Sequence, residues 1–195
     1  MNDSSPLSGR RLLLGVSGSI AAYKSATLVR LLVKSGAEVQ VILTEAAAAF
    51  VTPLTLGTLS KKPVLTGFLR DATSGQWHNH VELGLWADAY VIAPASANTL
   101  AQLANGFCPN LLSAVYLSAR CPVFLAPAMD LDMFAHPAVM QNLARLRSFS
   151  NHVFDSPSGE LASGLAGPGR MLEPEEIVRE LERYFNVEKP KGTSC

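Results

Sequence analysis

Three short clusters of small polar residues follow apolar runs in this sequence, and the first has the composition of a phosphate-binding turn. It places Ser17, Gly18 and Ser19 directly after the apolar run Leu12–Val16. Glycine lets backbone N–H groups approach a phosphate, while serine hydroxyls and a helix N-terminus add donors and positive potential. The spacing does not match the G-x-G-x-x-G dinucleotide pattern, and a tight strand-to-helix turn would use the same residues without any ligand.

The other two clusters add amide, hydroxyl and carboxyl groups. The second contains Ser96, Asn98 and Thr99, and the third places Asp130 after the rigid turn at Pro127. Ser96 could simply cap the following helix, but one cap does not require three polar side chains. We therefore expect both clusters to face a ligand.

Apolar runs that alternate with helix-period segments predict how these clusters are positioned. The expected strands are 12–16, 39–43, 89–93, 123–126 and 152–154. The expected helices are 20–35, 45–50, 53–60 and 174–185, with a further helix after each of the strands 89–93 and 123–126. This alternation predicts an α/β domain with a parallel sheet and helices on both faces. Such sheets bind ligands at the carboxyl ends of their strands, where all three clusters would lie.

Composition limits the classes of function. The chain has 195 residues, 48% of them hydrophobic and 16% charged, with a formal net charge of zero. We expect one folded domain at 11–185 with tails at 1–10 and 186–195, a flexible loop at 70–76, and no nucleic-acid partner, because no basic footprint is present. The apolar runs are too short to span a bilayer. Three cysteines without paired spacing and an N-terminus unlike a signal peptide predict a cytoplasmic protein without disulfides.

The three clusters resemble the signatures of a known family. The segments 18–21, 94–99 and 127–133 are similar to those of the homo-oligomeric flavin-containing cysteine decarboxylases, and the likeness extends over 11–185. It is strongest to the decarboxylase half of the bacterial bifunctional phosphopantothenoylcysteine decarboxylase/synthetase. The resemblance implies a single Rossmann-like, flavodoxin-like domain that assembles into trimers or dodecamers. It also implies a synthetase partner, as a domain or as a separate protein.

The resemblance further implies a cofactor, FMN, bound at the subunit boundary. Its phosphate would lie near the first cluster and Thr44, with Phe50 near the isoalloxazine ring. The implied FMN-binding residues are Ser17, Gly18, Ser19, Thr44, Phe50, Ser96, Asn98, Thr99, Ala128 and Met129.

A histidine segment completes the likeness. Residues 78–83 resemble the family's catalytic histidine segment, with His80 at the matching position. On its own, a lone histidine is more often structural. His78 and His80 without a nearby cysteine make a poor metal site, so we predict no metal. An imidazole with a pKa near 6.5 could act as a base close to neutral pH.

Two positions depart from the family pattern. Asp130 stands where the family has asparagine, in the turn that engages the substrate carboxylate, so an ionised Asp130 would repel that carboxylate unless it is protonated, paired or used differently. Ser163 stands where the decarboxylases carry a proton-donating cysteine, in a glycine-rich segment at 158–171. This segment matches the family's substrate-covering lid, although a mobile surface connection has a similar composition. The implied substrate-binding residues are Asp130, Met133, Ala162 and Ser163.

The activity implied by the resemblance is FMN-dependent decarboxylation of 4′-phosphopantothenoylcysteine to 4′-phosphopantetheine, with His80, Asp130 and Ser163 as the catalytic residues. Three alternatives remain. A peptide-type cysteine decarboxylase would stop at the ene-thiol, which suits the missing cysteine. A flavin prenyltransferase shares the fold, but the His80 segment and the lid at 162–164 favour a decarboxylase. A non-catalytic FMN-binding regulatory subunit often carries long acidic extensions, and none is present in this sequence.

Overall fold

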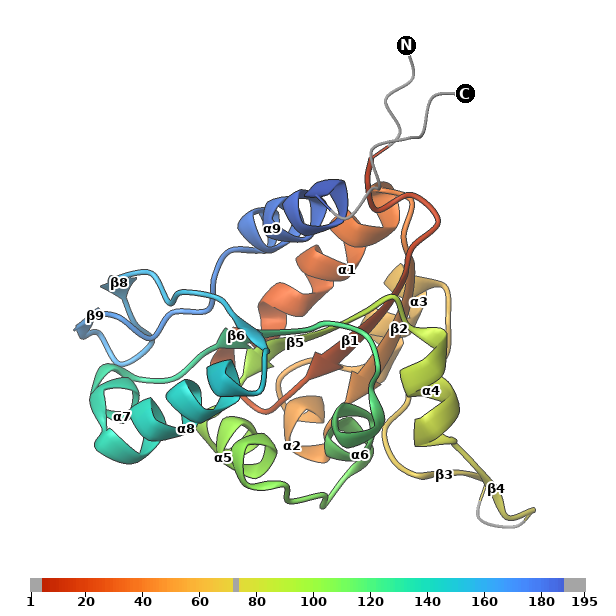
Figure 1. The fold of residues 1–195 in the computed structure, drawn as a ribbon, viewed down its shortest axis with the longest axis horizontal. Coiled ribbons are helices and arrows are strands. Elements are labelled where there is room, and N and C mark those ends of the chain that lie inside the picture. The colour runs from red at the N-terminus through yellow and green to blue at the C-terminus, as the bar shows by residue number, and fades with distance from the viewer. Residues whose placement is uncertain (1–4, 72–73, 188–195) are drawn as a thin grey trace.

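The structure, a computed structural model, describes residues 5–71 and 74–187. Within them, five parallel strands form the central sheet in the order β2-β1-β5-β6-β7 (Figure 1). The strands are β1 (Arg11–Val16), β2 (Glu38–Leu43), β5 (Ala89–Ala95), β6 (Val123–Pro127) and β7 (His152–Val153). The chain leaves β2 at one edge and returns beyond β1 to form β5, so the direction of strand addition reverses between β1 and β5.

Helices cover both faces of the sheet because successive strand side chains point to opposite sides. Leu12 and Leu14 belong to one apolar core, and Leu13 belongs to the other. Helices α1 (Lys24–Lys34) and α9 (Pro174–Val187) pack on the first face, with α3 (Pro53–Ser60) against α1. The second face is covered by α5 (Ala97–Asn105), α6 (Leu111–Ser118) and α8 (Pro137–Ser148), with α4 (His80–Trp86) against α6.

The remaining elements are short. The 3-10 turn η1 (Ile20–Tyr23) and the helices α2 (Glu45–Ala48) and α7 (Leu131–Ala135) follow β1, β2 and β6. Two small hairpins, β3–β4 (Leu69–Asp71, Gln76–Trp77) and β8–β9 (Gly159–Glu160, Ala166–Gly167), project at opposite ends of the molecule in Figure 1.

The predicted α/β architecture is confirmed. Several local features differ from the sequence prediction, among them helix α6, which was not predicted. The helix expected at 20–35 begins as the separate turn η1. Helix α4 was not predicted because Gly84 lowers helix propensity; that glycine allows close contact, since a Cβ there would lie 2.9 Å from the Ser118 carbonyl oxygen. The glycine-rich lid forms the β8–β9 hairpin.

The domain boundaries remain predictions. Leu7, in the expected N-terminal tail, is buried in the first core, and α9 continues to Val187. Residues 1–4 and 188–195 lie outside the described part of the chain, as do 72–73 in the expected loop, whose described flanks form the β3–β4 hairpin. No described helix has the length and apolarity that a bilayer crossing requires.

Candidate active site

A cavity of about 950 Å³ opens at the carboxyl ends of β1, β5 and β6. It lies beside the point where the direction of strand addition reverses, which is where open α/β sheets bind their ligands. Its volume is at the upper end of the range for small-molecule sites. The predicted site residues that line it are Gly18, Ser19, Thr44, Ser96, Asn98, Thr99, Ala128, Met129, Asp130, Met133 and Ala162.

Several polar side chains at this cavity also cap helices, which fixes their positions. Thr44 and Ser96 each accept a hydrogen bond at 3.3 Å from the backbone N–H three residues ahead, at the starts of α2 and α5. Ser19 caps η1, and Asp130 accepts the Leu131 N–H at 2.6 Å at the start of α7. These residues therefore have both of the roles considered for them, because the side chains that cap helices also line the cavity.

The N-termini of two longer helices also face the cavity. Ser96 precedes α5, and Asn110, which lines the same cavity, forms a capping box with Ser113 at the start of α6. Unpaired N–H groups and the helix dipole make such ends attractive to anions. These two helix ends therefore offer backbone donors to a phosphate.

Within the first cluster, Ser17 has a structural role, whereas Gly18 lines the cavity. Ser17 is buried and outside the cavity lining, and its hydroxyl donates to the Pro94 carbonyl oxygen at 2.8 Å and accepts the Ser96 N–H at 2.9 Å. It therefore joins the ends of β1 and β5. Gly18 lines the cavity, and a Cβ there would lie 2.7 Å from the Ala46 Cβ, so α2 can approach only because residue 18 is glycine.

The lid hairpin is fixed at its root and extends over the cavity. The Met129 N–H donates to the Gly169 carbonyl oxygen at 3.0 Å, which ties the lid to the turn that carries Asp130. Leu161 and Ala162 line the cavity. Ser163 does not; it is exposed at the hairpin tip, where its hydroxyl accepts the Leu165 N–H at 3.4 Å.

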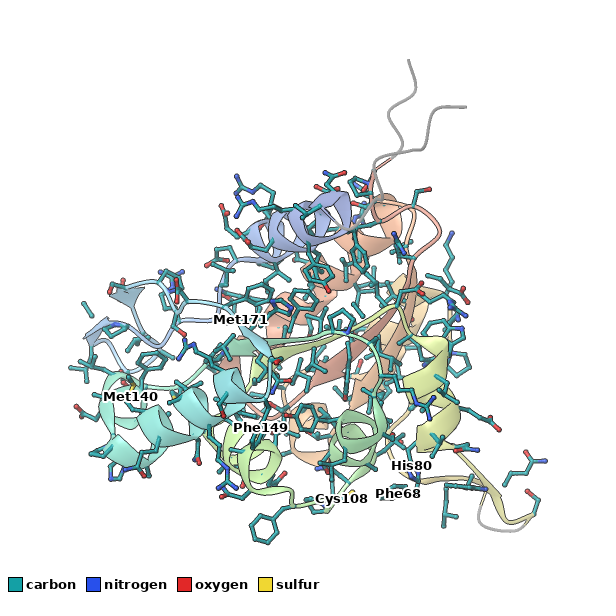
Figure 2. All side chains as sticks on the ribbon, in the orientation of Figure 1. Phe68, His80, Cys108, Met140, Phe149 and Met171 are labelled. Atoms are coloured by element: carbon teal, nitrogen blue, oxygen red, sulfur yellow. The ribbon has the colours of Figure 1, made fainter. Side chains whose placement is uncertain are left out.

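His80 and Phe50 lie outside this cavity. The His80 ring centroid is 6.5 Å from that of Phe68 and 5.8 Å from that of Trp77. Its Nδ1 is buried and has no hydrogen-bond partner among the residues that the structure describes. Figure 2 shows His80 beside Phe68 and apart from Met171, which lines the cavity. Phe50 is 46% exposed. Within the described part of a single chain, the predicted catalytic residue His80 does not line the predicted ligand cavity.

Charged residues that were not predicted also line the cavity. The cations are Lys24 and Arg170, and the carboxylates besides Asp130 are Glu45 and Glu160. Both cations bond to Glu173, and the Lys24 hydrogen bond is the main reason that the pKa of Glu173 lies below its ordinary value. The sequence feature that could have indicated this group of charges is Lys24, a single lysine at the start of the apolar helix α1.

A parallel sheet in this strand order, with a ligand cavity at the reversal point, defines a flavodoxin-like nucleotide-binding protein. The chain belongs to the Flavoprotein family, whose model matches residues 1–186. The family prediction made from the three polar clusters is thereby confirmed.

Individual relatives extend this finding. The chain is 59% identical over 139 residues to a cysteine/cysteine sulfinic acid decarboxylase of an unknown prokaryotic organism. The matched region covers 71% of this chain and 38% of that protein. It is 40% identical over 188 residues to the coenzyme A biosynthesis bifunctional protein CoaBC of Vibrio parahaemolyticus. The matched region covers 96% of this chain and 47% of that protein. The chain thus spans less than half the length of these two curated relatives.

Solved structures match over nearly their full length. A variant of PPC decarboxylase in complex with pantothenoylaminoethenethiol has a TM-score of 0.81 at 33% identity, covering 91% of this chain and 99% of that one. The FMN binding protein AtHal3 has a TM-score of 0.79 at 32% identity, covering 93% and 99%.

Proposed function

We propose that the chain catalyses FMN-dependent decarboxylation of 4′-phosphopantothenoylcysteine to 4′-phosphopantetheine in coenzyme A biosynthesis, in the cytoplasm. The proposal rests on the cavity at the reversal point, which is lined by residues from each of the three polar clusters. The likeness to PPC decarboxylase over 91% of the chain and to CoaBC over 96% supports the substrate.

The residues at the cavity fit FMN. The helix N-termini at Ser96 and Asn110 and the open backbone at Gly18 suit its phosphate, and Asn98 and Thr99 offer polar groups to its ring system. Bound FMN would supply the two-electron oxidation of the substrate thiol that makes loss of CO₂ easy, and would return the electrons to the product. The polypeptide contributes binding, orientation and proton movement.

The lid and the turn at Asp130 would enclose the cysteinyl end of the substrate. Asp130 and Met133 line one wall, and Ala162 lies on the lid opposite, tied to the same turn through the bond between Met129 and Gly169. Closure would exclude water from the reacting carbon. Ser163 at the lid tip is a weak acid compared with a thiol, so the final protonation is the step that this chain performs least readily.

His80 would serve the cavity of a neighbouring copy. It does not line its own cavity, its Nδ1 lacks a partner among the described residues, and exposed apolar side chains lie on its helix and on the preceding hairpin. Those side chains are Leu69, Trp77, Val81 and Leu85. A trimer in which each copy supplies His80 to its neighbour accounts for both the apolar surface and the position of the histidine outside its own cavity.

Decarboxylation of free cysteine is the second candidate. The 59% identical relative is a cysteine/cysteine sulfinic acid decarboxylase, and a free amino acid carries an α-ammonium group that the carboxylate of Asp130 could pair with. Phosphopantothenoylcysteine has an amide at that position and offers no such charge.

One assay separates the two substrates. Purified protein with bound FMN is incubated with 4′-phosphopantothenoylcysteine or with cysteine, and CO₂ and product mass are followed. We expect CO₂ and a saturated thiol from the first substrate at a kcat/KM at least tenfold above the second. A higher kcat/KM for cysteine would replace the first proposal by the second.

A further inference from the structure

The root of the lid contains an ion cluster centred on Glu173. One carboxylate oxygen, Oε1, accepts a hydrogen bond from Lys24 Nζ at 2.7 Å and from Arg170 Nη2 at 3.0 Å. Lys24 begins α1, whereas Arg170 and Glu173 both lie between the lid and α9, so the cluster joins two parts of the chain that are far apart in the sequence. Lys24 Nζ also donates to the Met171 carbonyl oxygen at 3.3 Å.

The two cations of this cluster differ in what they can offer a ligand. The Lys24 side chain is only 9% exposed and has two partners, whereas the Arg170 side chain is 39% exposed and has Glu173 as its partner among the described residues. A guanidinium has five N–H donors, so Arg170 retains donors for an anion. Arg170 Nη1 also lies against Gly159 of β8, where a Cβ would be 2.7 Å away.

Arg170 is thus the accessible cation of a cavity whose other charged lining residues, besides Lys24, are carboxylates within the described chain: Glu45, Asp130 and Glu160. These carboxylates repel an anionic substrate elsewhere in the cavity. An anionic group on the substrate would therefore be directed to Arg170. A guanidinium also matches the geometry of a phosphate through paired N–H donors.

We propose that Arg170 binds the phosphate of the substrate, and that Glu173, anchored by Lys24, positions the guanidinium for that contact. This rests on the proposed function, which supplies a substrate with a phosphate at the end remote from its cysteine. The substrate carboxylate is the less suitable partner, because an ion pair would stabilise the carboxylate before reaction more than the transition state, in which its electron pair passes to the substrate carbon and CO₂ leaves as a neutral molecule. The phosphate takes no part in the reaction, so its binding affects specificity and not the chemical step.

The test compares 4′-phosphopantothenoylcysteine with its dephosphorylated form, pantothenoylcysteine, as substrates of the FMN-loaded protein. We expect wild type to have a KM at least tenfold lower for the phosphorylated substrate. Arg170→Met should raise that KM by about tenfold to a hundredfold, the usual range for a lost charge-assisted hydrogen bond. The KM for pantothenoylcysteine, kcat and FMN content should stay unchanged.

Further variants separate binding from positioning. Arg170→Lys keeps the charge and should recover part of the discrimination between the two substrates. Glu173→Gln and Gly159→Ala leave Arg170 in place but disturb its guanidinium, so each should raise the KM for the phosphorylated substrate alone. Arg179→Met removes an exposed guanidinium on α9 that pairs with Glu176, and should change neither KM.

Three results would overturn the proposal: equal KM values for both substrates in wild type, an equal rise for both in Arg170→Met, or loss of FMN from that variant. If wild type releases CO₂ from neither substrate, the proposed function fails, and calorimetric titration with 4′-phosphopantothenate and pantothenate still decides the role of Arg170. Tighter binding of the phosphorylated compound that disappears in Arg170→Met would support that role. Equal binding of the two compounds would refute it.

Discussion

At the scale of single residues, hydroxyl side chains at the strand ends have two kinds of role. Ser96 and Thr44 cap helices while lining the cavity. Ser17 instead bonds two backbone groups at the end of β5 and has no contact with the cavity lining. A sequence pattern places all of these residues at strand ends, but it does not show which hydroxyl points inward.

Ser17→Ala should therefore affect stability more than cofactor binding. It leaves the Pro94 carbonyl and the Ser96 N–H without their buried partner, at a cost of about 1–3 kcal/mol each when nothing replaces it. Thr58→Ala is the matched control, because its hydroxyl also donates to a carbonyl oxygen but on an exposed face of α3. Urea denaturation should show a lower midpoint for the first variant, and equal midpoints would contradict this role.

Ser163 occupies the position from which the final proton would be donated in the proposed reaction. Ser163→Cys places a far stronger acid at the lid tip and should raise the ratio of saturated thiol to ene-thiol, with little change in the rate of CO₂ release. Mass spectrometry of the products measures the ratio. An unchanged ratio would mean that another group already donates the proton. Asp130 would then be the first to examine, because Asp130→Asn should in that case abolish the reduced product.

The charged groups at the lid root were not predictable from local sequence. Lys24 and Glu173 are separated by 149 positions, and neither belongs to one of the three polar clusters. Their pairing arises because β1 and α9 bring α1 and the lid root together in space. Residue spacing relates neighbours along one helix or strand. It therefore predicted the polar residues that line the cavity, but not the ion cluster at the lid root.

At the scale of elements, the lid root depends on Gly169. Its φ of +127° is rarely adopted by other residues, and a Cβ would lie 2.5 Å from the Met129 carbonyl oxygen. Sequence analysis predicted the lid and its glycines, but the hairpin and its tie to the turn at Asp130 require the third dimension. The five strands of the central sheet were predicted to within two residues at each end, because their continuous apolar runs match burial on both faces.

Gly169→Ala should displace the lid from the turn at Asp130. We expect at least a tenfold loss of kcat/KM with FMN retained, because the cofactor-facing helix N-termini are unaffected. Gly164→Ala is the control: its φ of +84° imposes a similar backbone penalty at the hairpin tip, where no atom lies within 4 Å of the added Cβ. Equal losses in both variants would show that backbone strain, and not the displaced root, is responsible.

At the scale of the whole molecule, the ion cluster couples stability to pH. The hydrogen bond from Lys24 lowers the pKa of Glu173 in the folded state. The contribution of ionised Glu173 to the free energy of unfolding is therefore complete above the ordinary glutamate pKa of about 4.3. It is lost as the pH falls through the lower pKa that Glu173 has in the folded state. Wild type should lose its stability advantage over Glu173→Gln in that acidic window. Urea midpoints at neutral and acidic pH measure it, with Glu180→Gln as the exposed control.

The proposed assembly makes a separate prediction. His80→Asn should retain FMN without releasing CO₂, and Asn98→Asp should lose FMN by adding a negative charge at the cavity. Mixed oligomers of the two variants should regain activity, because an intact cavity on one copy would meet an intact His80 on another. Light scattering establishes the trimer first; mixtures that remain inactive despite exchange of copies would contradict a shared site.

The most direct test of the proposed function is the FMN dependence of CO₂ release. Protein stripped of flavin and the same protein reloaded with FMN are each given 4′-phosphopantothenoylcysteine labelled in its carboxyl group, and labelled CO₂ is collected. We predict one FMN per chain after reloading and CO₂ release by the reloaded protein alone. Equal release with and without FMN, or none from the fully loaded oligomer, would contradict an FMN-dependent decarboxylase.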